Sequence, residues 1–174
     1  MGGPAIIDDV PYYEFDNFYE SKFIVDGVEY RSSEQYFQCQ KAYDPKINKF
    51  NLDEFKKVFN SGYGIGCWSA GSKVKNLRKD WEMVKVNIMY YANKFKIEQN
   101  LSLLEILVKT EGIIKLEEST TFWNFWNARI LERIRAENRQ NDNDNQYLEK
   151  LKILFEDYEN GKVKDQIYSK KSKY

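Results

Sequence analysis

Histidine is absent from this 174-residue chain, and its absence removes several kinds of catalytic and metal site. Without an imidazole there is no Ser-His-Asp or Cys-His catalysis and no histidine-based metal site. The two cysteines, Cys39 and Cys67, are far apart in the sequence and form no zinc or redox motif. Acid or base chemistry near neutral pH must then come from other side chains, and carboxylates are the leading candidates. We expect neither a metal nor a cofactor.

Long hydrophobic runs and an excess of one charge are also missing. No apolar stretch approaches the roughly 18 residues needed to span a bilayer, and residues 1–7 lack the basic and apolar segments of a signal peptide. Lys plus Arg and Asp plus Glu both number 27, which argues against general nucleic-acid binding but not against a pocket for one nucleotide. These features, with no disulfide or zinc motif at the cysteines, predict a cytoplasmic protein without membrane contact. The oligomeric state is not predicted.

Aromatic and turn residues organise the N-terminal part of the chain. Residues 1–22 are aromatic and show no regular period, so we expect irregular structure there. Phe23–Val25 and Val28–Tyr30 flank the dipeptide Asp26–Gly27, which predicts a two-residue β-hairpin. Ser32 then predicts a helix start, because Gln35 follows three residues later as in a capping box. This helix should end near Tyr43.

The rest of the chain has mostly helical periodicity. Gly62, Gly64, Gly66 and Gly71 predict a loop, and residues 112–116 a short strand. Capping residues and apolar spacing predict helices over 51–59, from Leu77 onward, over 102–109 with Ser102 as cap, over 122–138, and between 145 and Gly161. The chain is therefore predicted to form a mainly helical α+β domain over residues 1–160, with an N-terminal hairpin. Residues 161–174 are predicted to be a lysine-rich, flexible tail.

Glu34 is the carboxylate whose position invites a chemical role. It is expected in the first turn of a helix, where the helix dipole stabilises a negative charge. A first-turn glutamate also serves simply as a capping residue, and that alternative stays open. The functional reading gains from Tyr36, Phe37, Gln38 and Lys41, which offer an aromatic wall and polar donors close by in the sequence.

Several parts of the chain resemble the YbiA-like (NADAR) N-glycosidase family. They are Asn17–Tyr19, the hairpin with the following Ser32–Ala42, Leu77–Lys85, Met89, Leu103–Thr110, and a closing helix at Asn127–Arg135. The resemblance spans about residues 14–136. It implies a single YbiA-like domain that hydrolyses an N-glycosidic bond to a ribose phosphate. The implied substrates are riboflavin-pathway intermediates or ADP-ribosylated bases.

The resemblance also implies roles for particular residues. Glu34 corresponds to the catalytic carboxylate, Lys41 to a phosphate or pocket contact, and Trp81 to a stacking wall, although packing in the core explains Trp81 equally well. Lys79 belongs to a basic run beside Trp81 that suits a phosphate. The remaining substrate-binding candidates are Asn17, Phe18, Gln35, Tyr36 and Gln38.

The chain departs from the family pattern where a second acid is expected. The family usually has an aspartate, two residues, then Trp-Gly and a glycine-rich loop before its closing helix. The aspartate position here is Thr120 or Trp123, and the glycines are absent. Glu117 or Glu118 is a possible substitute acid, and a solvated surface role is the alternative for both. Two other functions therefore stay open. One is a nucleotide-binding or ADP-ribose-binding module of the same fold that has lost catalysis, and the other is a protein-interaction domain that uses exposed aromatics and the basic tail.

Overall fold

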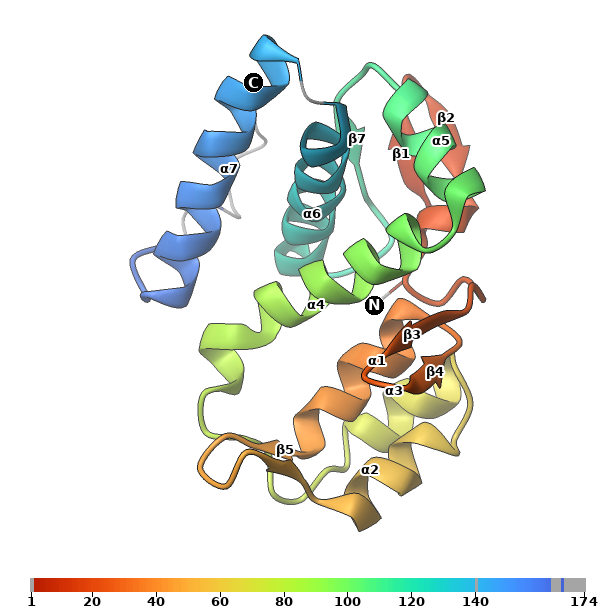
Figure 1. Cartoon of the computed structure of the whole chain (residues 1–174), viewed down its shortest axis with the longest axis vertical. Coiled ribbons are helices and arrows are strands. Elements are labelled where there is room, and N and C mark those ends of the chain that lie inside the picture. Colours follow the sequence, from red (N-terminus) through yellow and green to blue (C-terminus); the bar gives the residue numbers. More distant parts are fainter. Residues whose placement is uncertain (1, 140, 164–166, 168–174) are drawn as a thin grey trace.

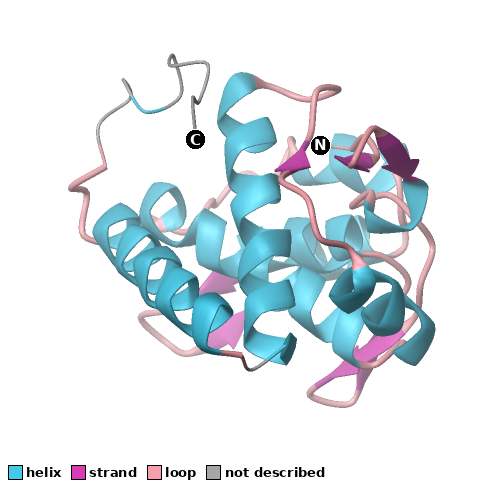
Figure 2. Ribbon diagram, turned by 90° about the horizontal axis from the view of Figure 1, so that it is seen from above, coloured by secondary structure: helices cyan, strands magenta, loops and turns pink. Residues whose placement is uncertain are grey.

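Helix α4 (Trp81–Glu98) crosses the middle of the computed structural model, which describes residues 2–139, 141–163 and 167 (Figure 1). On one side of α4 lie the N-terminal strands and the later helices, and on the other side lie the earlier helices and two hairpins. The other helices are α1 (Ser33–Cys39), α2 (Leu52–Phe59), α3 (Ile65–Gly71), α5 (Leu101–Lys109), α6 (Thr121–Arg139) and α7 (Asp142–Glu159). The strands are short and lie among the helices (Figure 2). The predicted mainly helical α+β domain is confirmed.

The expectation of irregular structure before residue 23 is wrong. Strand β1 (Ala5–Ile7) is the central strand of an antiparallel sheet, between β2 (Val10–Tyr12) and β7 (Ile114–Lys115). Ile7 pairs with Val10 on one side and with Ile114 on the other, and it is almost completely buried. Three-residue strands show little alternation, and the partner β7 is more than a hundred residues away in the sequence. No local pattern therefore reveals this sheet.

The predicted hairpin forms as β3 (Phe23–Val25) and β4 (Val28–Tyr30), with Val25 opposite Val28. Asp26 and Gly27 both have positive φ angles, 50° and 78°. Those angles are typical of the turn type that matches the twist of the two strands. A second hairpin, β5 (Tyr43–Asp44) with β6 (Lys49–Phe50), was not predicted.

The caps of α1 and α2 form as the sequence predicts. Ser32 Oγ accepts a hydrogen bond of 3.0 Å from Gln35 N, and Asn51 Oδ1 accepts one of 3.2 Å from Glu54 N. Helix α1 is followed by a short 3-10 turn, Gln40–Ala42. A cap satisfies a backbone N–H that has no partner within the helix, and this local requirement is readable from the sequence.

The prediction that the glycines at 62–71 form a loop is wrong in part, because residues 65–71 form α3. A Cβ atom on Gly66 would overlap Ser61 O, and one on Gly71 would overlap Gln38 Oε1. Gly62 keeps a positive φ of 103° in the turn before the helix. The glycines inside α3 therefore allow close packing, whereas only the earlier part of this stretch is a connector.

Two helix starts also differ from the prediction. Helix α4 begins at Trp81 and not at Leu77, which is exposed. Its buried residues surround much of the helix because α1, α5, α6 and α7 all pack against it. Helix α5 begins after Asn100 and not at Ser102.

Two hydrophobic clusters flank α4. The larger includes Trp81, Trp126 and Ile134, and the smaller contains Phe23, Tyr30, Cys39, Val58 and Cys67. Helices α6 and α7 bury the predicted apolar residues, with Trp126, Ile130 and Ile134 completely inaccessible. Gly161 ends α7 with a φ of 68°. Within the described ranges no helix is both long and apolar enough to cross a bilayer. Most of the predicted tail, residues 164–166 and 168–174, lies outside them.

Candidate functional site

The carboxylate of Glu34 lies in the first turn of α1 and is completely inaccessible to solvent. Its backbone N–H donates a hydrogen bond of 3.0 Å to Asn17 O, which ties the preceding loop to the helix start. Gln38 follows one helical turn later on the same face, and its Nε2 donates a hydrogen bond of 2.6 Å to Glu34 Oε1. The sequence thus brings a carboxylate and an amide together through helical spacing alone.

Burial changes the protonation of Glu34. It raises the pKa of the carboxyl group, while the hydrogen bond from Gln38 and the positive charge of Lys41 act in the opposite direction. Burial likewise lowers the pKa of Lys41, and the charge of Glu34 opposes that shift. A carboxyl group with a raised pKa holds its proton more readily, which suits a residue that must accept and return a proton.

The charge of Lys41 acts on Glu34, and Lys41 in turn lies over Trp81. Lys41 Nζ donates a hydrogen bond of 3.2 Å to Gly71 O and lies 5.4 Å from the centre of the Trp81 ring. Phe37 packs between Trp81 and Trp123, with ring centres 4.9 Å and 5.4 Å away. Trp81 and Trp123 retain exposures of 6% and 7%. We call Glu34, Gln38, Lys41 and Trp81 the Glu34 cluster.

A buried polar network holds the start of α1 in place. Ser33 Oγ donates a hydrogen bond of 3.1 Å to Asn93 Oδ1 on α4, and Asn93 Nδ2 donates one of 2.9 Å to Asn17 Oδ1. Lys96, one turn further along α4, donates a hydrogen bond of 2.8 Å from Nζ to Asp16 O. Helix α4 therefore fixes both α1 and the loop that precedes the hairpin. This rigidity suits a site whose groups must keep their positions during a reaction.

Two amide side chains near this region carry polar atoms without hydrogen-bond partners. Over the described residues, Gln38 Oε1 and both polar atoms of Asn127 are buried and make no hydrogen bond. Asn127 lies on α6 one turn after Trp123 and is 3% exposed. Buried amides without partners are costly and uncommon, so hydrogen bonds from a ligand that reached these atoms would remove that cost. Asn127 was not among the predicted binding residues, although an asparagine beside the apolar positions of α6 is a signal that the sequence contains.

Several predicted binding residues make contacts other than with the Glu34 carboxylate. The side chain of Gln35 bridges Arg31 N and Phe59 O, at 2.8 Å and 2.9 Å, and so joins α1 to its neighbours. Tyr36 packs toward the smaller core and points away from Glu34 around the helix. Phe18 is half-buried beside Gly2. Lys79 is exposed and borders a hollow next to the β5–β6 hairpin.

The acids considered as substitutes are exposed. Glu117 and Glu118 both lie on the surface after β7, and the side chain of Glu118 packs against Gly3. Thr120 Oγ1 accepts a hydrogen bond of 3.3 Å from Trp123 N and so caps α6. Trp123 itself faces Phe37. In the part of the chain that is described, no group of three or more Cys, Asp or Glu residues is arranged to hold a metal ion.

Comparisons with known proteins agree with one another. A model of the NADAR domain family matches residues 7–147. N-glycosidase YbiA of Escherichia coli (strain K12) is 32% identical over 114 residues, which cover 64% of this chain and 68% of that protein. The protein of the same name from Shigella flexneri matches with the same identity and coverage. The NMR structure of the E. coli protein YbiA matches with a TM-score of 0.58 and 27% identity, over 80% of this chain and 81% of the other.

Proposed function

This chain belongs to the NADAR domain family, and we propose on that premise that it is an N-glycosidase acting on a ribosyl- or ADP-ribosyl-type nucleotide. The substrate classes in view are riboflavin-pathway intermediates and ADP-ribosylated bases. The observation that carries the proposal is the buried carboxylate of Glu34, 2.6 Å from Gln38 Nε2 and under the influence of the Lys41 charge.

The reaction requires little more than one well-placed carboxylate. The bond between C1′ and the base nitrogen breaks, positive charge develops on the ribose, and water adds its hydroxyl to C1′. The proton that the water loses ends on the departing nitrogen. Glu34 stabilises the positive charge and passes this proton, which its raised pKa favours. Lys41 and the free amide atoms of Gln38 and Asn127 are suited to the substrate's oxygen atoms.

Substrate entry requires a local rearrangement. The side chain of Glu34 is completely buried, so no substrate atom reaches it without displacement of a neighbouring segment. Trp81 and Trp123 lie on either side of Phe37 and are almost completely buried. A flat base that enters between neighbouring segments would contact these indole rings, and stacking of this kind contributes about 1–3 kcal/mol per base.

The test incubates the protein with ribosylamine phosphates and with ADP-ribosylated guanine nucleotides, and chromatography measures the base that is released. Glu34→Gln keeps the shape of the side chain and removes its charge, so we expect kcat to fall by at least about 100-fold. The double variant Glu117→Gln, Glu118→Gln is the matched control because both acids are exposed. Undiminished release by Glu34→Gln would contradict the role of Glu34. Loss of base release in the double variant would show that Glu117 or Glu118 acts as the second acid.

The departure at Thr120 favours one alternative, a module that binds ADP-ribose or a related nucleotide without turning it over. Calorimetry with ADP-ribose separates the two functions. Saturable binding without any base release supports the binding module, whereas release from any of the candidate substrates supports the enzyme.

A further inference from the structure

Helix α1 presents two different faces. With about 100° of rotation per residue, Glu34, Gln38 and Lys41 lie on one side, and Tyr36 and Gln40 lie on nearly the opposite side. The first face carries the Glu34 cluster. The second face borders a cavity of about 410 Å³ that the proposed N-glycosidase reaction does not use.

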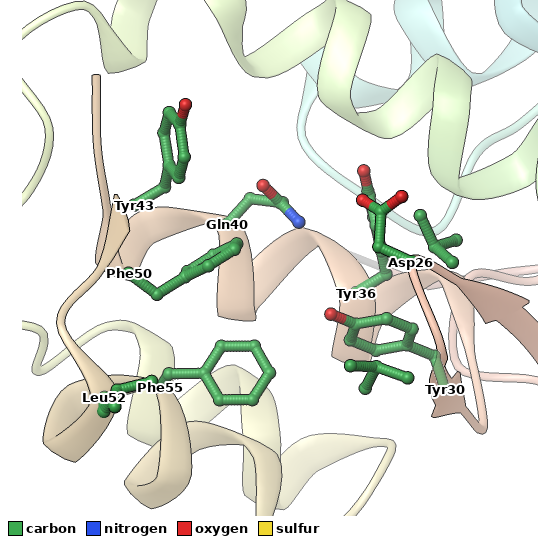
Figure 3. A pocket seen from close by; sticks show the side chains of 10 residues that line it. Asp26, Tyr30, Tyr36, Gln40, Tyr43, Phe50, Leu52 and Phe55 are labelled. Atoms are coloured by element: carbon green, nitrogen blue, oxygen red, sulfur yellow. The ribbon is translucent and has the colours of Figure 1, made fainter. Parts of the chain in front are cut away.

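Half of the residues that line this cavity are aromatic. Tyr43 and Phe50 stand on one side of it, Tyr30 and Tyr36 stand on the other, and Gln40 lies between them (Figure 3). Phe55 and Leu52 of α2 close the bottom, and Asp26 at the tip of the β3–β4 hairpin points toward the opening (Figure 3). We call this cavity the aromatic slot. Its volume lies within the range of cavities that hold small organic ligands.

The polar groups of the aromatic slot are Gln40, Asp26 and the hydroxyls of its three tyrosines. Gln40 offers an amide, and Asp26 offers an exposed carboxylate whose charge helps to raise the pKa of Tyr36 to about 12, after burial as the main cause. A small number of polar groups among aromatic rings is typical of a site for a flat heterocycle, whose edge carries donors and acceptors.

A second hollow lies on the other side of the β5–β6 hairpin and is basic. It measures about 680 Å³ and includes four cationic side chains, Lys46, Lys75, Arg78 and Lys79, with Asp44 as its one acid. Arg78 is paired with Asp80 at 2.7 Å, whereas Lys75 and Lys79 are exposed. We call this the basic hollow.

Two aromatic residues separate the hollows and line both of them. Tyr43 and Phe50 border the aromatic slot and the basic hollow alike, and they are paired across the β5–β6 hairpin with ring centres 5.2 Å apart. The guanidinium of Arg78 lies 5.1 Å from the centre of the Tyr43 ring. A ligand with one flat end and one anionic end would therefore meet matching surfaces on either side of one pair of rings.

We propose that the aromatic slot and the basic hollow together bind a nucleoside 5′-phosphate. The base stacks on the rings of the slot with its edge toward Gln40 and Asp26. The phosphate crosses the β5–β6 hairpin to Lys75 and Lys79, because ammonium groups are strong donors to phosphate oxygens. This site is separate from the Glu34 cluster and does not depend on the proposed N-glycosidase activity. It also gives Lys79 a phosphate contact at a different place from the one that the sequence suggested.

The test is calorimetry with GMP and AMP, with guanosine and inorganic phosphate as the two fragments. We expect saturable binding of at least one nucleotide, about tenfold or more tighter than guanosine. Phe50→Ala should weaken it by about tenfold or more, the size expected for a lost base contact. The exposed pair Lys75→Ala, Lys79→Ala should lower the affinity for the nucleotide and reduce the salt dependence of that affinity. The affinity for guanosine should stay the same. The pair Lys56→Ala, Lys150→Ala removes two exposed lysines that border neither hollow, and it should change nothing.

Amide shift mapping in an NMR titration with GMP locates the site. Shifts centred on residues 26–30 and 40–50 support the proposal. Shifts centred on Trp81 and the amides of Glu34 and Gln38 would overturn it, because the nucleotide would then occupy the Glu34 cluster. Failure of both nucleotides to bind, or equal binding by the wild type and the Lys75, Lys79 pair, would overturn it as well. The lysine variant keeps the proposal testable even if Phe50→Ala fails to fold.

Discussion

The side-chain amide of Gln38 donates a hydrogen bond of 2.6 Å to the carboxylate of Glu34, and Gly71 of α3 packs directly against that same amide. The first contact follows from helical spacing within α1. The second depends on the close approach of α1 and α3, which only a residue without a Cβ atom permits. The position of the amide beside the carboxylate is therefore controlled by a glycine 33 residues later in the chain.

Gly71→Ala should lower activity through Gln38. The new methyl group would overlap Gln38 Oε1, so the amide must turn away from Glu34. A misplacement of this kind costs up to about 100-fold in rate, whereas alanine is itself favourable within a helix. The measurement is kcat/KM for base release beside the free energy of unfolding. The double variant Gly71→Ala, Gln38→Ala should have the same kcat/KM as Gln38→Ala alone. If the losses in kcat/KM instead add, the effect of Gly71 does not act through Gln38.

Asn127→Leu should separate activity from stability. The amide of Asn127 is buried and has no hydrogen-bond partner among the described residues, so an apolar side chain of similar shape removes a desolvation cost of about 1–3 kcal/mol. We expect unchanged or higher stability together with a loss of about tenfold or more in kcat/KM. Asn124 on the same helix is the control, because its amide bonds both the N–H and the C=O of Ser119. Asn124→Leu should be destabilising, and full activity of Asn127→Leu would rule out substrate contact.

Glu34→Gln should make stability less dependent on pH. Burial raises the native pKa of this carboxyl above its ordinary value of 4.5, so the native state holds the proton more tightly than the unfolded state. The stabilising effect is complete below 4.5 and is lost as pH rises through the native pKa. The amide does not titrate, so the free energy of unfolding of the variant should rise relative to that of the wild type as pH increases through this window. Urea unfolding at pH 4.5, 6 and 8 measures the difference, and a constant difference would contradict the raised pKa.

Lys96→Met should change the alkaline side of the stability profile. Burial lowers the pKa of Lys96 to about 7, so between pH 7 and 10.5 the unfolded state binds more protons than the native state. The stability of the wild type therefore rises with pH across this window and is lost as pH falls toward 7. Methionine lacks this dependence and also leaves Asp16 O without its donor. Urea unfolding at pH 7, 8.5 and 10 should show the free energy of unfolding of the wild type rising relative to that of the variant. Parallel pH profiles would count against a neutral lysine in the native state.

Local chemistry made much of the molecule predictable. The Asp26–Gly27 turn, the Ser32 and Asn51 caps and the buried residues of α6 and α7 all depend on residues a few positions apart. The same local spacing placed Glu34 at a helix start with Gln38 one turn away, and the resemblance of the stretch around it indicated the family.

The features that were not predicted join segments that are far apart along the chain. The pairing of β1 with β7, the glycine contact between α3 and α1, and the burial of Asn127 all require segments that the fold brings together. The sequence placed Lys79 and Tyr36 with the other binding candidates, and only the tertiary structure assigned Tyr36 to the aromatic slot and Lys79 to the basic hollow. Sequence determined the β3–β4 turn and the caps of α1 and α2, because those requirements are satisfied by hydrogen bonds within a turn. Tertiary structure alone decided which faces meet, because burial and close approach are properties of two segments and not of one.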